Sequence, residues 1–278
     1  MSSPLLSLEI PLRLAVAIVV FSVMAGWEMA HGVLTPRVSK GPRWLANLSL
    51  VAIDTVVVRL LLPAGLVGAA LWVEGRGWGL LPALGLPRLL VAVSAVLLLD
   101  LAVYAQHVLF HAAPVLWRFH RVHHADHDVD VTTGLRFHPV EIVLSVGWKL
   151  VLVAGLGIPA EATLVFEILL NGTSIFNHAN ADLPIRLDRF LRLVLVTPDM
   201  HRIHHSVERA EHSSNFGFSL TWWDRMLGTY RQEPAAGRRG LRVGLPELAE
   251  PRVQGLGWLL ALPWLRPRPG AEDVGNRP

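Results

Sequence analysis

The sequence predicts an all-α integral membrane protein, and three observations support this prediction. The chain of 278 residues is 52% hydrophobic, with a mean hydropathy of +0.44. Only 17% of the residues are charged, whereas about a quarter are charged in soluble domains. Twelve of the 13 histidines fall between positions 107 and 212. We therefore expect about three spanning helices, a re-entrant helix hairpin and a cytosolic helical cap that holds a histidine-rich dimetal site.

The composition also excludes several kinds of site and partner. The chain has no cysteine, so disulfides, thiolate zinc sites and thiol nucleophiles are excluded. The formal net charge of +3 comes almost wholly from arginine, and many arginines flank apolar runs, which suits a membrane surface better than nucleic acid. The segment MSSPLLSLEIPLRL lacks a positively charged start, so we expect the apolar run after it to be a retained span and not a cleaved signal peptide.

The expected membrane helices come from four apolar blocks. The first three cover residues 12–33, 45–73 and 84–110, and each exceeds the ~20 residues that cross a hydrocarbon core. Helices are expected because lipid offers no partner to an unpaired backbone group. The fourth block, 140–175, is interrupted by GLGIP. We expect a hairpin there, whose arms of roughly 15 residues return the chain to the side it left.

The flanks of this hairpin indicate its orientation. A histidine lies on each flank, His138 and His178, and arginines lie on both flanks but not at the turn. By the positive-inside rule we expect the histidine-bearing face to be cytoplasmic. Lys149, within the first arm, is the one charge that does not fit.

Three regions follow from this division. N-terminal transmembrane helices are expected in 1–96, a histidine-bearing domain in 97–231 and a C-terminal segment in 232–278. Within the last region, the apolar run at 255–265 is too short to span, so it is expected at the membrane interface or packed on the cap. The final dozen residues are expected to be disordered.

The histidines form four groups: HVLFH at 107–111, HRVHH at 120–124, the single histidine of FNHAN, and HRIHH at 201–205. Residues three and four positions apart share a helix face, and neutral imidazole is a common ligand of Fe, Zn and Cu. Nine candidate ligands are too many for one ion and suitable for two. They are His107, His111, His120, His123, His124, His178, His201, His204 and His205. We expect the two HRxHH boxes to supply the two metals from opposite sides of one site.

Some histidines have other interpretations. A single HxxHH could be a solvated basic surface, but two copies together with HxxxH favour a ligand set. His31 is expected to be an interfacial polar residue, and His212 to belong to a polar loop outside the site. His127 and His138 lie near the first box, and each could be an extra ligand or hold a ligand in place.

Acidic residues near the histidines look supportive. Asp100 and Tyr104 share a helix stripe with His107. A carboxylate inside an apolar run is costly unless it serves a site, so we expect Asp100 to orient a ligand imidazole; a structural bond to another helix is the alternative. The only ExxH is Glu28 with His31, which argues against a carboxylate-bridged bundle. No HExxH, GxSxG or phosphate-binding glycine loop occurs.

These motifs resemble the fatty acid hydroxylase / sterol desaturase superfamily of membrane-bound non-haem di-iron oxygenases. The resemblance covers about 97–231 and extends beyond the histidines to LRFHPVE, NHAN, TPDMHRIHHS, NFG and WWDRMLGTY. The family's metal ligands map onto the nine histidines. One position departs from some relatives, which carry a histidine where this chain has Ser174. The tenth ligand could thus be His138, Asn177 or a water, and Asp199 beside the last box is another candidate supporting residue.

The resemblance implies two irons, O2 and attack on an unactivated C–H bond of a lipid such as a sterol or fatty acid. It further implies electrons from NAD(P)H through a separate reductase and a ferredoxin or cytochrome b5-like carrier, because the chain has no flavin or nicotinamide fingerprint. Hydroxylation is favoured over desaturation. The alternative is a histidine-rich membrane metal-binding or transport protein without oxygenase activity, whose ligands would be spread along the spans. A haem-binding electron carrier would leave the triads without a purpose.

Overall fold

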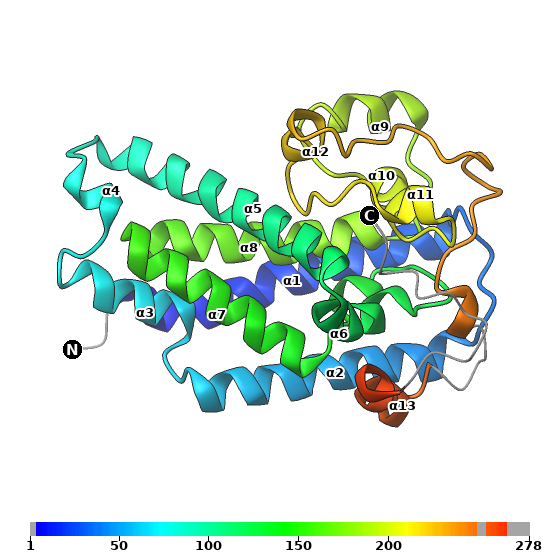
Figure 1. Cartoon of the computed structure of the whole chain (residues 1–278), viewed down its shortest axis with the longest axis horizontal. Coiled ribbons are helices and arrows are strands. Elements are labelled where there is room, and N and C mark those ends of the chain that lie inside the picture. Colours follow the sequence, from blue (N-terminus) through cyan, green and yellow to red (C-terminus); the bar gives the residue numbers. More distant parts are fainter. Residues whose placement is uncertain (1–3, 249–253, 266–278) are drawn as a thin grey trace.

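The computed structural model describes residues 4–248 and 254–265, which form helices and isolated β-bridges but no strand (Figure 1). The longer helices are α1 (Pro4–Ala30), α2 (Lys40–Leu61), α3 (Gly65–Glu74), α5 (Arg88–Ala112), α6 (Pro114–His124), α7 (Pro139–Leu156) and α8 (Ala160–His178). The shorter ones are α4 (Leu80–Ala83), α9 (Ile185–Leu191), α10 (Pro198–His204), α11 (Arg209–His212), α12 (Trp222–Met226) and α13 (Leu256–Ala261), with 3-10 turns η1 (Thr133–Leu135), η2 (Pro246–Leu248) and η4 (Leu262–Trp264). The all-α prediction is confirmed.

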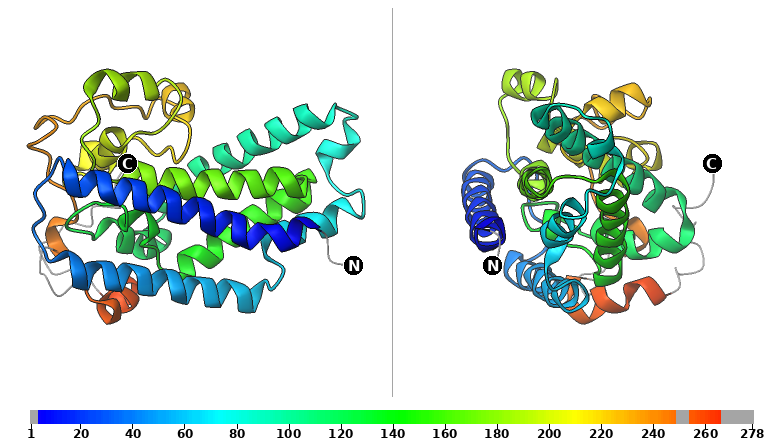
Figure 2. Two further views of the ribbon diagram at one scale, coloured as in Figure 1. Left: turned by 180° about the vertical axis from the view of Figure 1, so that it is seen from behind. Right: turned by 90° about the vertical axis from the view of Figure 1, so that its left-hand side faces the viewer.

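The long helices form a stalk, and most of the short ones gather at one end of it (Figures 1 and 2). Four helical segments of the described residues are long and apolar enough to cross a membrane: Ser7–Ala30, Lys40–Glu74, Arg88–Ala112 and Pro139–Leu156. The fourth is the first arm of the expected hairpin, so the structure offers one candidate span more than the three predicted. The second is interrupted between α2 and α3, where Pro63 has no N–H with which to continue the helix.

The predicted hairpin is present, and its turn lies at the end of the stalk remote from the histidines. Gly157 ends α7 with φ +67°, a conformation that glycine adopts without strain. A Cβ on Gly79 would lie 2.1 Å from the nitrogen of Gly157, so the turn packs backbone to backbone against the connection between α3 and α5. The hairpin therefore brings His138, before α7, and His178, at the end of α8, back toward the same region.

The C-terminal segment that the structure describes packs against α6. Leu259 and Leu262 are buried in one apolar cluster with Trp117 of α6. Arg121 of α6 donates to the backbone carbonyl of Leu262 at 2.6 Å. The run 255–265 is therefore packed on α6, and its position relative to a membrane interface stays a prediction. The expected disordered tail lies outside the described residues.

Buried ion pairs fix the loop that follows the first histidine box. Arg43, 1% exposed at the start of α2, donates to Asp126 at 2.8 Å and also to Asp130. Arg136 lies 3.7 Å from Asp126. Burial would raise the pKa of Asp126, but the two arginines lower it overall. This network ties α2 to the segment between α6 and α7.

Candidate metal centre

Four helices deliver the nine predicted histidines to one buried region. His107 and His111 lie in the last part of α5, and His178 ends α8. The two boxes lie on α6 and α10, with His205 as the residue that follows α10. The N-terminus of α10 is stabilised in two ways. Pro198 occupies its first turn, and the side chain of Thr197 caps the helix by accepting from the backbone N–H of Met200.

The histidine nitrogens converge in two groups, within each of which the candidate ligand atoms lie within 4.8 Å of one another. One group contains His107, His111, His120, His124 and His204, and the other contains His123, His178, His201 and His205. The structure thus brings together all nine predicted residues, which are almost entirely buried except for the half-buried His111.

Each HRxHH box is divided between the two groups. His120 and His124 join one group while His123 joins the other; His201 and His205 join one group while His204 joins the other. In both boxes the residue at i+3 departs from the pair at i and i+4. At about 100° per residue, i+3 lies some 60° to one side of i, and i+4 some 40° to the other. A helix passing between two metals would present its histidines to both in this way.

Hydrogen bonds fix five of the imidazoles through Nδ1. The acceptors are Phe216 O for His107 (2.7 Å), Glu141 Oε1 for His120 (2.7 Å), Arg136 O for His123 (3.3 Å), Ser174 O for His178 (2.7 Å) and Ser214 O for His204 (2.7 Å). An imidazole that donates from Nδ1 presents a lone pair at Nε2 in its neutral form. Such outer contacts orient metal-binding histidines and raise their basicity.

The Nε2 atoms then face one another at short range. His178 Nε2 lies 3.1 Å from His123 Nε2 and 3.0 Å from His201 Nε2. His178 and His123 both donate from Nδ1, so the lone pairs on their Nε2 atoms point toward each other. This arrangement is unfavourable unless a cation lies between the two nitrogens. Two nitrogen ligands at about 2.1 Å from a metal and at right angles are about 3.0 Å apart. The donor set therefore fits a metal ion.

Unpartnered nitrogens support the same interpretation. Buried polar atoms are nearly always hydrogen-bonded, yet His111 Nε2, His204 Nε2 and both ring nitrogens of His205 have no partner among the described residues. Burial lowers the pKa of His120 and of His178 to about 3. These rings are therefore neutral near pH 7, which is the form that binds metals.

The six further candidates lie outside both groups. Asp100 accepts from Trp223 Nε1 at 2.8 Å, Tyr104 bonds Thr229, Asn177 donates to Phe218 O, Asp199 pairs with Arg202, His127 bonds Leu248 O, and His138 caps α7. Asp100 thus makes a bond to another helix, the alternative to its expected role. Tyr104 is connected to the site through a chain of hydrogen bonds. The hydroxyl of Thr229 also donates to Asp224, and Asp224 accepts from the backbone N–H of Phe216. The carbonyl of Phe216 in turn accepts from His107 Nδ1.

The positions of two residues at the site, His212 and Glu141, were not predicted from the sequence. His212, expected in an outlying polar loop, is 3% exposed, with its ring centroid 4.5 Å from that of His124 and 4.8 Å from that of His111. Glu141 holds His120 and was not singled out. Glu141 could have been recognised in the sequence, because a carboxylate in an apolar helix is costly unless it serves a site.

Gly134, which has no side chain, allows η1 to pack closely against the end of α8. A Cβ on Gly134 would lie 2.4 Å from Ser174 O, the acceptor of the His178 bond, and 3.1 Å from His178 Nδ1. We expect Gly134→Ala to displace this turn, to cost about 1–3 kcal/mol in unfolding free energy and to weaken metal retention. Thermal unfolding and metal content of the purified protein measure both effects.

The matched control is Gly147→Ala on α7, where a Cβ would meet nothing within 4 Å. That change is expected to leave the metal content unaltered and not to lower the unfolding free energy, because alanine favours a helix interior more than glycine does. Equal behaviour of the two variants would contradict the close approach.

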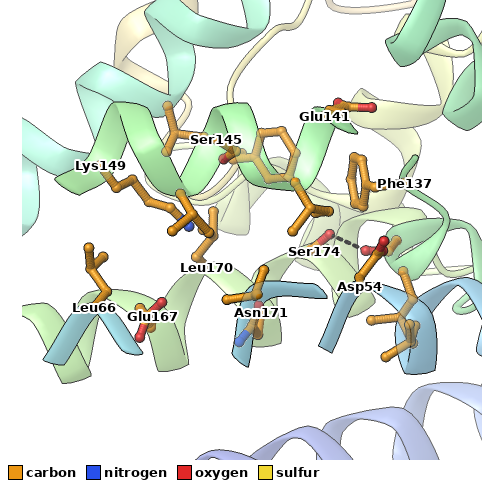
Figure 3. Close-up of a pocket in the computed structure, with 18 of the residues that line it drawn as sticks. Asp54, Leu66, Phe137, Glu141, Ser145, Lys149, Glu167, Leu170, Asn171 and Ser174 are labelled. Atoms are coloured by element: carbon orange, nitrogen blue, oxygen red, sulfur yellow. Dashed lines mark hydrogen bonds between the residues drawn. The ribbon is translucent and has the colours of Figure 1, made fainter. Parts of the chain in front are cut away.

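A cavity of about 380 Å³ is lined both by two of the histidines and by side chains inside the stalk. Figure 3 shows part of this lining. His107, His120 and Glu141 line one end, and apolar side chains such as Phe110 and Phe137 lie beside them. The cavity continues between α2, α7 and α8. Its position allows an elongated molecule to reach the histidines from within the helical bundle.

The fold and site define a helical protein with candidate membrane spans and two adjacent groups of buried histidines that could hold metal ions. Residues 92–229, about half of the chain, match the family model described as fatty acid hydroxylase. The chain belongs to the fatty acid hydroxylase family, which confirms the resemblance seen in its motifs.

Curated relatives include three lipid-modifying proteins. Ornithine lipid hydroxylase of Rhizobium tropici is 30% identical over 148 residues, 53% of this chain and 44% of that protein. Human alkylglycerol monooxygenase is 30% identical over 50% of this chain and 30% of that protein. Rat cholesterol 25-hydroxylase is 32% identical over 58% of this chain and 56% of that protein. The matches thus span about half or less of these relatives, and no solved structure matches the chain significantly.

Proposed function

We propose that this protein is an O2-dependent, non-haem di-iron membrane oxygenase that hydroxylates an unactivated C–H bond of a lipid. The observation that carries the proposal is the convergence of nine histidines in two adjacent groups at one end of a cavity inside an apolar bundle. The family and the lipid hydroxylases among the curated relatives support the same class of reaction.

The protein's own groups have definite tasks in this proposal. The five-histidine and four-histidine groups would each hold one iron, and two irons so held would supply the activation of O2 and the oxidation of the C–H bond. Glu141, Ser174 O and Ser214 O keep three of the imidazoles oriented through Nδ1. The aromatic side chains near the histidines keep water from the reacting carbon.

Electrons are proposed to come from NAD(P)H through a separate reductase and a ferredoxin or cytochrome b5-like carrier. Arginines flank the hairpin on its histidine-bearing side, so we propose that the site faces the cytoplasm, where such carriers are available. Hydroxylation is preferred to desaturation because the curated relatives include hydroxylases and monooxygenases.

The alternative, a metal transporter, would need ligands at several depths along the spans. The nine histidines instead lie together where the helices α5, α6, α8 and α10 meet. A single buried cluster favours a resident metal centre over a transport path.

The test is lipid oxidation by the purified protein in lipid nanodiscs, with iron, a chemical or enzymatic reductant and isotopically labelled O2. Wild-type protein is expected to place one labelled oxygen atom in a lipid product. His204→Ala should abolish the product and lower the iron content while leaving membrane insertion unchanged, because His204 belongs to the five-histidine group. His31→Ala, an exposed histidine outside both groups, is the matched control and should retain activity. Full activity of His204→Ala would refute the ligand assignment.

A further inference from the structure

The cavity has a polar end remote from the histidines. Its lining there includes Arg13, Arg59, Lys149 and Glu167. Lys149 is only 7% exposed and lies eight positions from Glu141, or roughly 12 Å along α7. Figure 3 shows Lys149 and Glu167 toward one end of the lining, and Glu141 and Asp54 toward the other. A charged group inside a membrane helix is costly and usually functional.

Positive charge exceeds negative charge at this end. Arg13 Nη1 donates to Glu9 at 2.8 Å and to Glu167 at 2.9 Å. Arg59 lies 3.8 Å from the same oxygen of Glu9. Both carboxylates are thus engaged by arginines, and no carboxylate oxygen of the described residues lies within 4 Å of the Lys149 ammonium. Lys149 is the cation left over.

The end near the histidines has the opposite polarity. Asp54 and Glu141 line it, and one carboxyl oxygen of each, Asp54 Oδ1 and Glu141 Oε2, is buried without a hydrogen-bond partner among the described residues. The ionisable residue that interacts electrostatically with Asp54 is Glu141, whereas those that interact with Lys149 are Glu167 and Arg13. The basic end is therefore the one that offers an anionic group cationic partners.

We propose that the substrate is an anionic amphiphile whose oxyanion, a carboxylate or a phosphate, binds Lys149 deep in the stalk. Its hydrocarbon chain then extends past Asp54 toward His107 and His120. Hydrogen bonds between an ammonium and an oxyanion are among the strong ones in proteins, and this bond would supply an anionic partner within 4 Å, which the described residues do not give Lys149. The oxidised carbon would lie about 12 Å or more from the oxyanion. The term substrate rests on the proposed function, but binding does not need turnover and is tested without it.

Three ligands of equal chain length test the proposal on metal-loaded protein in phosphatidylcholine nanodiscs: dodecanoate, dodecyl phosphate and dodecan-1-ol. Wild-type protein is expected to bind at least one of the anions about tenfold more tightly than the alcohol, since a hydrogen bond to a charged group contributes that much or more. The tighter anion identifies the oxyanion.

Variants show whether Lys149 is responsible. Lys149→Arg should keep the preference for the anion, and Lys149→Met should lose it. The matched control, Arg88→Met, removes an exposed cation that pairs with Glu161 and does not line the cavity, so the preference should remain. Equal affinity of wild-type protein for anions and alcohol, or an unchanged preference in Lys149→Met, would overturn the proposal. Anion preference without any oxidised product would leave this site standing and refute the proposed oxygenase function.

Discussion

Replacement of His178 by alanine is expected to lower the iron content from about two to about one per chain and to reduce hydroxylation at least about 100-fold. His178 is the member of the four-histidine group whose Nε2 lies closest to two others, 3.1 Å from His123 and 3.0 Å from His201. Changes to residues that merely hold a metal ligand cost 10–100-fold, so loss of a ligand itself should cost more. Elemental analysis and product quantification measure the two effects.

The five-histidine group gives this experiment its internal comparison. His204→Ala should also remove about one iron, from the other group, because His204 and His178 belong to different groups. Size-exclusion profiles of both variants should match that of wild-type protein. If His178→Ala retained two irons, the assignment of the four-histidine group would be wrong.

Replacement of Arg43 by methionine is expected to destabilise the protein by about 3–5 kcal/mol, the usual cost of removing one partner from a buried ion pair. Arg43 neutralises Asp126 and Asp130, and neither carboxylate is exposed to water. Asp126 would retain Arg136 at 3.7 Å, but Asp130 would lose its bonded cation. Thermal or denaturant unfolding in detergent, followed by helical circular dichroism, measures the loss.

Arg88→Met is again the appropriate control, because Arg88 and Glu161 form an exposed pair. Exposed pairs contribute about 0–1 kcal/mol, so this variant should unfold close to wild-type protein. Similar destabilisation by both changes would contradict the prediction, because the buried ion pairs of Arg43 would then contribute no more to stability than the exposed pair.

The elements of the fold and the identity of the clustered histidines could be predicted from the sequence because both depend on local patterns. Apolar blocks longer than a bilayer crossing indicated the long helices, and GLGIP indicated the turn now formed at Gly157. The spacing of HRxHH placed each triad on one side of a helix. These features need no knowledge of which helix contacts which.

The remaining features depend on tertiary packing. The division of each box between two groups requires α6 and α10 to lie between two centres, which spacing within one box does not reveal. His212 looked peripheral because its neighbours ERAEHSS are polar, yet α11 folds back so that its ring meets His124. The role of Gly134 is set by the approach of η1 to Ser174, far away in the sequence.

The central claim is that the two histidine groups hold two metal ions, and the iron content of the wild-type protein tests it most directly. The protein should be expressed in iron-supplemented medium, purified in detergent and analysed for metals alongside quantitative amino-acid analysis. Two iron ions per chain, or two zinc ions taken up in their place, are predicted from one ion in each group. Folded wild-type protein that binds no metal, even after reconstitution with ferrous iron, would contradict the account.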